Sequence, residues 1–370
     1  MSAGILPKSP FVRSLLAQAD HMNRAAHEAA HPHFPFLTAG DVPAVAALLA
    51  RLGWLEEGEQ VVACDRAGPG NMNLTLRVVT DRRTAVLKQA RPWVEKYEQI
   101  DAPWDRGIFE CRFYERVAGL REVADRMPRL LAADERARVL WLEHLPEASD
   151  YSSLYGGGQL APDEVAALAR WLRALHGGTR GAVEPQFANR AMRVLNHQHL
   201  CEVPLTSHGL ALEALEPGLE AAAARLRDDR AYVDAVAEVG RRYLADGTCL
   251  VHGDYFPGSW LRTPAGPRII DPEFCFWGPP EWDVGCAVAH LVLARQPQVR
   301  IEQFMRDYGE GLDMSWVARF AAVEVMRRVI GVAQLPIPPS THQRAAWLAG
   351  SRAALESATV ERLYDTAPEG

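Results

Sequence analysis

The chain has 370 residues, 48% of them apolar and 24% charged, which is enough for two domains and a sizeable core. Its net charge of −7 excludes the general positive field with which proteins attract nucleic acid. The sequence has no apolar run of the roughly 18 residues that a membrane-spanning helix needs, and its N-terminus lacks the order of a signal peptide. We therefore expect a cytoplasmic protein with no nucleic-acid or membrane partner.

The first part of the chain predicts a mixed region that contains strands. Residues 1–36 are expected to form an N-terminal extension with room for one helix. An amphipathic helix is predicted over 42–52, with Thr38 as its N-cap. Strands are predicted over 60–65, 73–80, 84–89 and 139–143. Between the last two of these strands, residues 95–118 have a mostly helical pattern that is interrupted near Pro103.

The second part of the chain predicts helices around two short strands. Helices are expected over 162–176, 203–216, 219–244, 283–294, 301–310, 315–335 and 342–363. The two strands, 249–251 and 268–270, lie in the middle of this series. The predicted fold class is therefore α+β: an N-terminal lobe over 37–143 with an antiparallel sheet plus helices, a hinge over 144–150, and a mostly helical C-terminal lobe over 151–370.

Each of the two short strands in the second part ends in acidic residues. The first is followed by His252-Gly253-Asp254, and the second by Asp271-Pro272-Glu273. Phosphoryl transfer needs one carboxylate that orients a hydroxyl nucleophile and others that hold Mg²⁺ on the nucleotide phosphates. Asp254 is the candidate catalytic base. Because Mg²⁺ prefers hard oxygen ligands, its candidate ligands are Asp271, Glu273 and Ser259.

Two neighbours of these residues have structural interpretations. A histidine beside a catalytic carboxylate can transfer protons or hold the loop, and we expect His252 to brace the loop. Asp283 is expected either to cap the helix that begins at Val284 or to brace the same loop.

A glycine-rich segment between two predicted strands is a candidate phosphate-binding loop. It contains Gly68, Gly70, Asn71 and Asn73, and its glycines would let backbone N–H groups approach phosphates. Taken alone, the segment is better explained as a plain hairpin turn.

Lys88 follows this loop within an apolar strand, in a chain that has lysine at only two other positions. A lysine there can reach nucleotide phosphates if a carboxylate holds it in place. Glu110 is the preferred partner and Glu115 the alternative. At the end of the next predicted strand, the backbone of Glu143 and Leu145 is expected to bind adenine.

Several stretches resemble the aminoglycoside phosphotransferase and choline kinase superfamily, which has a protein-kinase-like fold, and within it the methylthioribose kinase branch. The glycine loop is similar to that branch's GDGNLN, residues 271–279 to its DPEFAFYGP, and residues 327–333 to its twin-arginine helix. Ser259 stands where that branch has serine.

The resemblance implies the use of ATP and Mg²⁺ to phosphorylate the 1-hydroxyl of 5-methylthioribose, a step of methionine salvage, by an enzyme that can be a homodimer. It places Arg327 and Arg328 near the sugar or the transferred phosphoryl group. Tyr255 and Trp277 depart from the branch's pattern and are expected to border the acceptor site. A site this aromatic suits a different ring or an apolar 5-substituent.

Two alternative functions stay open at this point. The first is another small-molecule kinase of the superfamily, with an amino alcohol, an amino acid or an aminoglycoside as acceptor. The second is a nucleotide-binding pseudokinase that acts through conformation. The presence of Lys88, Asp254 and Asp271 argues against the pseudokinase.

Overall fold

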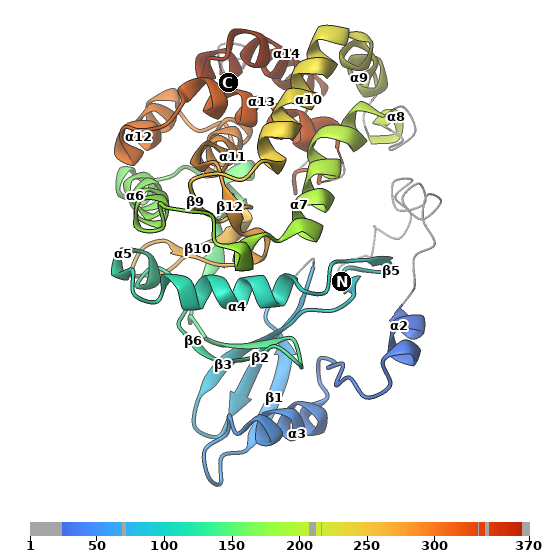
Figure 1. Ribbon diagram of the computed structural model, residues 1–370, viewed down its shortest axis with the longest axis vertical. Helices are drawn as coiled ribbons and strands as arrows, with labels where there is room; N and C mark the ends of the chain where they lie inside the picture. The colour runs from blue at the N-terminus through green and yellow to red at the C-terminus, as the bar shows by residue number, and fades with distance from the viewer. Residues whose placement is uncertain are drawn as a thin grey trace. The chain divides into compact units, whose positions relative to one another are not determined.

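The computed structural model describes residues 24–68, 72–206, 212–215, 217–331, 333–336 and 340–364. Within these residues the chain divides into two compact units, and the boundary falls between Glu147 and Ala148. Each unit is described by itself below, and Figure 1 labels their elements.

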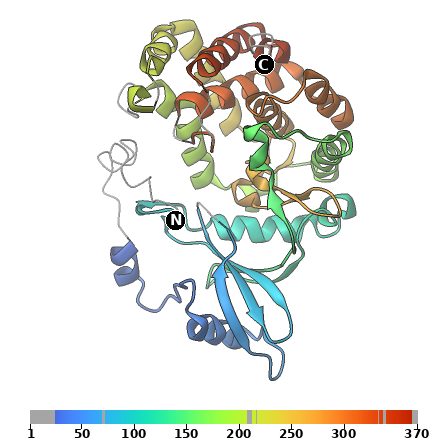
Figure 2. The same ribbon diagram turned by 180° about the vertical axis from the view of Figure 1, so that it is seen from behind.

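The smaller unit is built on a five-stranded antiparallel sheet with the strand order β1-β2-β3-β7-β6. Its strands are β1 (Val61–Arg66), β2 (Leu74–Thr80), β3 (Thr84–Gln89), β6 (Leu130–Asp134) and β7 (Val139–Glu143). Helix α3 (Val42–Leu52) lies beside β1, which both ribbon views show (Figures 1 and 2). The predictions for α3, β3 and β7 are confirmed to the residue, whereas β6 was not predicted.

Because side chains alternate in direction along the strands, this sheet has one face that packs on α3 and another that contacts α4. Leu76, Leu87 and Trp141 belong to one hydrophobic cluster with Val45 and Leu49 of α3. Because successive side chains of a strand point to opposite faces, Lys88 points away from that cluster. Its face of the sheet is the one that contacts α4 (Arg106–Val117), which crosses the unit in Figure 1.

Two local predictions for the smaller unit are wrong. Residues 95–102 are not helical, because Trp93 pairs with Asp101 and Val94 with Tyr97 in a hairpin of β4 (Trp93–Val94) and β5 (Tyr97–Asp101). The N-cap of α3 is Asp41 rather than Thr38, since the Asp41 carboxylate accepts a hydrogen bond from the Ala44 N–H at 3.1 Å. The described part of the N-terminal extension contains helix α2 (Arg24–Ala30), and a short helix α5 (Arg121–Ala124) follows α4.

The larger unit is mostly helical. Helices α11 (Pro280–Leu293) and α13 (Met314–Ile330) pack together at its centre, and every residue of α11 is buried. Around them lie α6 (Pro162–Gly178), α7 (Arg190–His197), α8 (Leu212–Leu215), α9 (Leu219–Asp228), α10 (Arg230–Leu244), α12 (Gln298–Tyr308) and α14 (Thr341–Ser357). The predicted helix 219–244 is divided in two, because Asp229 leaves the helical conformation and its side chain caps α10 at the Tyr232 N–H.

The prediction of a continuous helix over 203–216 is also wrong. Residues 203–205 form a single 3₁₀ turn that follows a π-helical turn at Gln198–Glu202, Thr206 is not helical, and the next described helix is α8. Residues 207–211 and 216 lie outside the described part of the chain.

Short strands carry the acidic turns of the larger unit. Strand β9 (Cys249–Val251) pairs with β12 (Phe276–Gly278), and β10 (Trp260–Arg262) pairs with both β8 (Ser149–Asp150) and β11 (Arg268–Ile269). The predicted strands at 249–251 and 268–270 therefore exist but belong to different sheets. The strand that comes after the second acidic turn, β12, is the one that joins the two turns.

All six cysteines lie in the described part of the chain, are buried and form no disulfide bond there, and no helix in the described ranges is both long and apolar enough to cross a bilayer.

Candidate functional site

The pairing of β9 with β12 brings the two acidic turns of the larger unit together. Val251 lies opposite Phe276, so Asp254 comes three residues after this pair and Glu273 three residues before it. Gly253 has φ +88°, and a Cβ there would overlap the backbone carbonyl of Phe274. A glycine is therefore required at this position, because it allows the two turns to touch.

Asp283 braces the first turn. From the first turn of α11, its carboxylate accepts hydrogen bonds from the His252 N–H at 2.6 Å and the Gly253 N–H at 2.9 Å. His176 Nε2 lies 3.1 Å from the same carboxylate, and Asp283 is fully buried. Of the two roles expected for Asp283, the bracing role is confirmed.

His252 links the two turns. Its Nε2 lies 3.0 Å from the carbonyl oxygen of Ile270, just before Asp271, and the Asp254 N–H donates to its Nδ1 at 3.3 Å. These contacts assign the ring a neutral form with the proton on Nε2. The expectation that His252 is a structural brace is confirmed.

Ser259 lies beneath the same turn. Its hydroxyl donates to the carbonyl oxygen of Asp254 at 2.8 Å, and 2% of the residue is exposed. The hydroxyl proton is therefore used to hold the turn that carries Asp254, and the oxygen lone pairs could serve a cation or its water.

The Asp254 carboxylate is set apart by its electrostatics. Its side chain keeps 24% of its surface exposed. Burial raises its pKa to about 6, with the charges of Glu324 and Glu273 acting in the same direction, while Arg328 and Arg327 act to lower it. Asp254 is therefore ionised at neutral pH and can still accept a proton, which is the property that a general base needs.

The second acidic turn has carboxylate oxygens that are suitable ligands for a hard cation. Asp271 adopts the left-handed conformation at φ 63°, which turns the chain sharply into the 3₁₀ turn Pro272–Phe274. The Asn189 side-chain amide holds this turn by donating to the carbonyls of Glu273 at 3.0 Å and Cys275 at 2.9 Å. Two carboxylates on one held turn, with a third carboxylate near enough to be affected by Glu273, fit Mg²⁺.

The twin arginines share one buried carboxylate. Glu324 is fully buried on α13, and its carboxylate accepts hydrogen bonds from Arg327 Nη1 at 3.1 Å and from Arg328 Nε at 2.6 Å. Arg328 also places Nη2 3.9 Å from the Asp254 carboxylate, and its guanidinium lies over the Phe256 ring at 4.8 Å. Arg327 keeps a buried Nε that has no hydrogen-bond partner among the described residues.

Two substrate-site predictions are corrected. Tyr255 is fully buried, stacks on Trp171 with ring centroids 5.4 Å apart, and donates its hydroxyl to the Leu168 carbonyl. Trp277 is 1% exposed and lies in the paired strand β12 beside Phe187. Both side chains fill the core beneath the acidic turns, so neither has a surface with which to contact an acceptor.

Four further residues near the twin arginines were missed. Glu324, His290 and Tyr155 form a buried chain of polar contacts that ends at Arg328. His199 lies on the π-helical turn, and burial together with the charge of Arg327 lowers its pKa to about 4. A single Glu and a single His inside otherwise apolar helical stretches were the available signal for Glu324 and His290, whereas Tyr155 and His199 lie in segments without a regular pattern.

In the smaller unit, Lys88 pairs with Glu110 and not with Glu115. Lys88 Nζ lies 2.9 Å from one oxygen of the Glu110 carboxylate and 2.7 Å from the other, and both residues are buried. The pair joins the α4 face of β3 to the second turn of α4, so the position of the Lys88 ammonium is fixed by both elements.

Arg106 anchors the end of the glycine-rich segment. It is fully buried and donates to the Met72 carbonyl at 2.7 Å and to the side-chain oxygen of Asn73 at 2.9 Å. The Asn73 side chain therefore faces inward and holds the segment. Gly68 is exposed, and a Cβ there would meet nothing within 4 Å. Gly70 and Asn71 lie outside the described residues.

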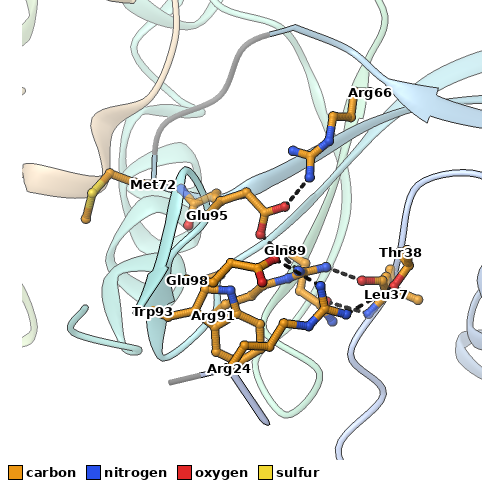
Figure 3. A network of polar contacts seen from close by, with 12 residues as sticks. Arg24, Leu37, Thr38, Arg66, Met72, Gln89, Arg91, Trp93, Glu95 and Glu98 are labelled. Carbon is orange, nitrogen blue, oxygen red and sulfur yellow. Dashed lines mark hydrogen bonds and ion pairs between the residues drawn. The ribbon is translucent and has the colours of Figure 1, made fainter. Parts of the chain in front are cut away.

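An ionic network around the buried Glu95 connects both ends of this segment, as Figure 3 shows. The Glu95 carboxylate accepts a hydrogen bond from Arg66, on the strand before the segment, at 2.5 Å and another from Arg91 at 2.9 Å. The Glu95 N–H donates to the Met72 carbonyl at 3.3 Å, at the other end of the segment. Arg91 also donates to the Leu37 carbonyl.

The residues expected to bind adenine lie at the end of β7. Glu143 is half-buried, donates its N–H to the Arg129 carbonyl at 2.9 Å, and forms an ion pair with the Arg129 side chain at 3.3 Å. Leu145 follows the strand and is also half-buried. Their binding of adenine stays a prediction.

The comparisons with known proteins identify the family. Residues 64–320 match the family described as the phosphotransferase enzyme family, which is more than half of the chain. The chain belongs to this family. Its fold resembles that of LicA in complex with AMP, with a TM-score of 0.50 at 14% identity over 88% of this chain and 98% of that one. The expected fold class, an α+β protein-kinase-like fold, is confirmed.

Several curated relatives are methylthioribose kinases. The enzyme from Exiguobacterium sibiricum is 28% identical over 255 residues, which are 65% of this chain and 63% of that enzyme. Methylthioribose kinase 1 of Oryza sativa is 26% identical, over 68% of this chain and 60% of that enzyme. The chain thus spans less than two thirds of the length of these two relatives. The alignment with the Geobacillus thermodenitrificans enzyme is longer, at 24% identity over 84% of this chain and 88% of that enzyme.

Proposed function

We propose that this protein is an ATP-dependent kinase that phosphorylates a hydroxyl group of a small metabolite, with the 1-hydroxyl of 5-methylthioribose or a related 5-substituted ribose as the acceptor. The observation that carries the proposal is the close approach of the two acidic turns at Gly253 and Phe274. The chain's family and its similarity to methylthioribose kinases support it.

In this proposal the smaller unit supplies the groups that bind the nucleotide. Lys88, held by Glu110, pairs with the phosphates, as a strand lysine does in other phosphotransferases of this fold. The glycine segment from Gly68 to Asn73 presents backbone N–H groups to the phosphates, and its anchored end reduces the loss of entropy on binding. The backbone of Glu143 and Leu145 forms hydrogen bonds with the adenine base.

The metal and the base belong to the larger unit. Asp271 and Glu273 would hold Mg²⁺, with the Ser259 oxygen directly or through water, and the ion would neutralise charge on the phosphates. Asp254 takes the proton of the acceptor hydroxyl. As that oxygen forms its bond to the γ-phosphorus, the bond from the γ-phosphorus to the bridging oxygen breaks and ADP leaves.

The acceptor would be recognised around the twin arginines. The unpartnered Nε of Arg327 offers a donor for a sugar oxygen or a phosphoryl oxygen, and Arg328 lies beside the base. His199, neutral at physiological pH because its pKa is about 4, can donate to and accept from hydroxyl groups. The Phe256 ring adds an apolar surface near Arg328.

The test is an acceptor screen with the purified chain, ATP and Mg²⁺, in which acceptor-dependent ADP release is measured. We expect the highest kcat/KM with 5-methylthioribose or another 5-substituted ribose. Faster turnover of an amino alcohol, an amino acid or an aminoglycoside would overturn the sugar but keep the kinase. Retained Mg·ATP binding without turnover of any acceptor would overturn the kinase in favour of a pseudokinase.

A further inference from the structure

The larger unit contains a chain of buried polar side chains that reaches the catalytic turn from behind. It runs from Tyr155 on the 3₁₀ turn Tyr151–Gly156, through His290 on α11 and Glu324 on α13, to Arg328 and Asp254. The Tyr155 hydroxyl contacts His290 Nδ1, and His290 Nε2 lies 3.1 Å from the Glu324 carboxylate. The same carboxylate oxygen accepts from Arg328 Nε at 2.6 Å.

In this network of side chains, the protonation states determine which group donates and which accepts in each hydrogen bond. Burial and the charge of Arg328 lower the pKa of His290 to about 4, so the imidazole is neutral and carries one proton. Glu324 is ionised, because Arg327 and Arg328 hold the pKa of this carboxyl well below its usual range despite its burial. The carboxylate can only accept, so the proton lies on His290 Nε2, and Nδ1 accepts from the Tyr155 hydroxyl.

The Tyr155 hydroxyl therefore selects the tautomer that lets His290 donate to Glu324. Without that donor, Nδ1 would be a buried acceptor with no partner, and the imidazole could move its proton to Nδ1. Glu324 would then face a lone pair of His290 at 3.1 Å and would lose one of the donors that fix its orientation.

The position of Glu324 in turn sets that of Arg328. The Arg328 guanidinium is held by Glu324 on one side and by the Phe256 ring on the other, and it reaches the Asp254 carboxylate at 3.9 Å. The Phe256 ring also packs on His290, with centroids 5.1 Å apart. A shift of the imidazole thus disturbs both supports of Arg328.

Cys286, His290 and Glu324 also have the ligand types and mutual proximity of a metal site. The two guanidinium groups on Glu324 occupy its oxygens and add positive charge where a cation would have to bind. The hydrogen-bonded arrangement is therefore the better interpretation of this cluster.

We propose that Tyr155 and His290 are positioning residues that act through Glu324 to hold Arg328 beside Asp254. This inference rests on the proposed kinase activity, since its effect is on the alignment of the acceptor and base. Neither residue contacts the reacting atoms, so neither is a catalytic residue.

The main test is a double-mutant cycle between Tyr155→Phe and Arg328→Lys. Tyr155→Phe removes one hydroxyl and leaves the ring, and we expect kcat/KM for the acceptor to fall by about tenfold, as for the loss of one buried hydrogen bond. The KM for ATP should not change. In the Arg328→Lys background the same substitution should cost less than about twofold, because the group that Tyr155 positions is already displaced.

The matched control is Tyr232→Phe. Tyr232 is also a buried tyrosine of this unit, and its hydroxyl lies 2.9 Å from that of Ser351 on α14, outside the network. It should lose stability in the same way as Tyr155→Phe but keep the wild-type kcat/KM. Additive effects of Tyr155→Phe and Arg328→Lys, or equal kinetic losses in both Tyr→Phe variants, would overturn the proposal.

A measurement that needs no turnover separates this proposal from the kinase proposal. In ¹⁵N spectra of the histidine-labelled protein, His290 should carry its proton on Nε2 in the wild type and shift toward the other tautomer in Tyr155→Phe. A proton on Nδ1 in the wild type would overturn the network even if the enzyme is active. A wild type that turns over no acceptor would contradict the proposed function, and the spectra would still decide the network.

Discussion

Each of the two units buries a glutamate between two arginines. We interpret the cluster in the smaller unit as one that stabilises the fold, and the cluster in the larger unit as one that also positions a group at the proposed active site. In the smaller unit, Glu95 lies between Arg66 and Arg91, and Arg91 ends on a backbone carbonyl. In the larger unit, Glu324 lies between Arg327 and Arg328, and Arg328 extends to the carboxylate of Asp254. Arg91 thus donates to a buried carboxylate and to a backbone carbonyl, whereas Arg328 also directs one nitrogen toward a carboxylate that is partly exposed.

Electrostatics supports this contrast. Burial lowers the pKa of Arg91 to about 10, although the Glu95 charge acts against it. Burial also acts to lower the pKa of Arg328, but the charges of Glu324 and Asp254 raise it above the usual value. Arg328 thus sits among excess negative charge, and an incoming phosphoryl group would compete with Asp254 for it.

The largest expected effect comes from removing the base. Asp254→Asn should lower kcat by roughly 10² to 10⁴-fold, the usual contribution of a general base. Nucleotide affinity, measured by calorimetry, should persist. Asp234→Asn on the exposed face of α10 is a matched control that should keep full activity. Wild-type turnover in Asp254→Asn would remove this residue from the mechanism.

The next effect concerns the metal. Asp271→Asn replaces one carboxylate of the held turn with a neutral amide, which binds Mg²⁺ less well, so turnover should be lost or should require far more Mg²⁺. A titration of activity against Mg²⁺ at saturating ATP measures this. An unchanged Mg²⁺ requirement would contradict the assignment of Asp271.

The two glutamates provide the direct test of the contrast between the clusters. Glu95→Gln and Glu324→Gln each break a buried ion network, so each should cost about 3–5 kcal/mol of unfolding free energy. Only Glu324→Gln should also lower kcat in the molecules that remain folded. Denaturant unfolding and turnover per folded molecule measure both quantities, and a kcat loss confined to Glu95→Gln would reverse our interpretation.

The smallest effect is a shift in pH dependence. Asp254 must be ionised to act as a base and its pKa is about 6, so kcat/KM should rise with pH and level off above that value. Because Arg328 lowers this pKa, Arg328→Gln should move the rising limb to higher pH. A wild-type profile that is flat between pH 5 and 7, or a limb that moves to lower pH in the variant, would show that another group controls the rate.

The sequence predicted the parts of the site that depend on local chemistry. The acidic turns follow short apolar strands, and the Lys88–Glu110 pair joins a strand to the next helix, so pattern and spacing were sufficient. For Asp283 the sequence left two roles open, a helix cap and a brace, and its hydrogen bonds to the first turn decide for the brace.

The sequence did not predict what depends on long-range packing. The role of β12 as the partner of β9, the inward orientation of Tyr255 and the inward orientation of Trp277 are set by contacts between distant segments. Residues 95–102 were predicted as part of a helix over 95–118, whereas the pairing of Trp93 with Asp101 and the buried hydrogen bonds of Glu95 decide their structure.

The central claim is that Asp271 and Glu273 hold the metal of a bound nucleotide next to Asp254. Crystals grown with Mn²⁺ and a non-hydrolysable ATP analogue test it through the anomalous scattering of the metal. We predict a peak at metal–oxygen distance, about 2.1 Å for the magnesium that Mn²⁺ replaces, from a carboxylate oxygen of Asp271. A bound nucleotide whose metal lies away from both Asp271 and Glu273 would contradict the account.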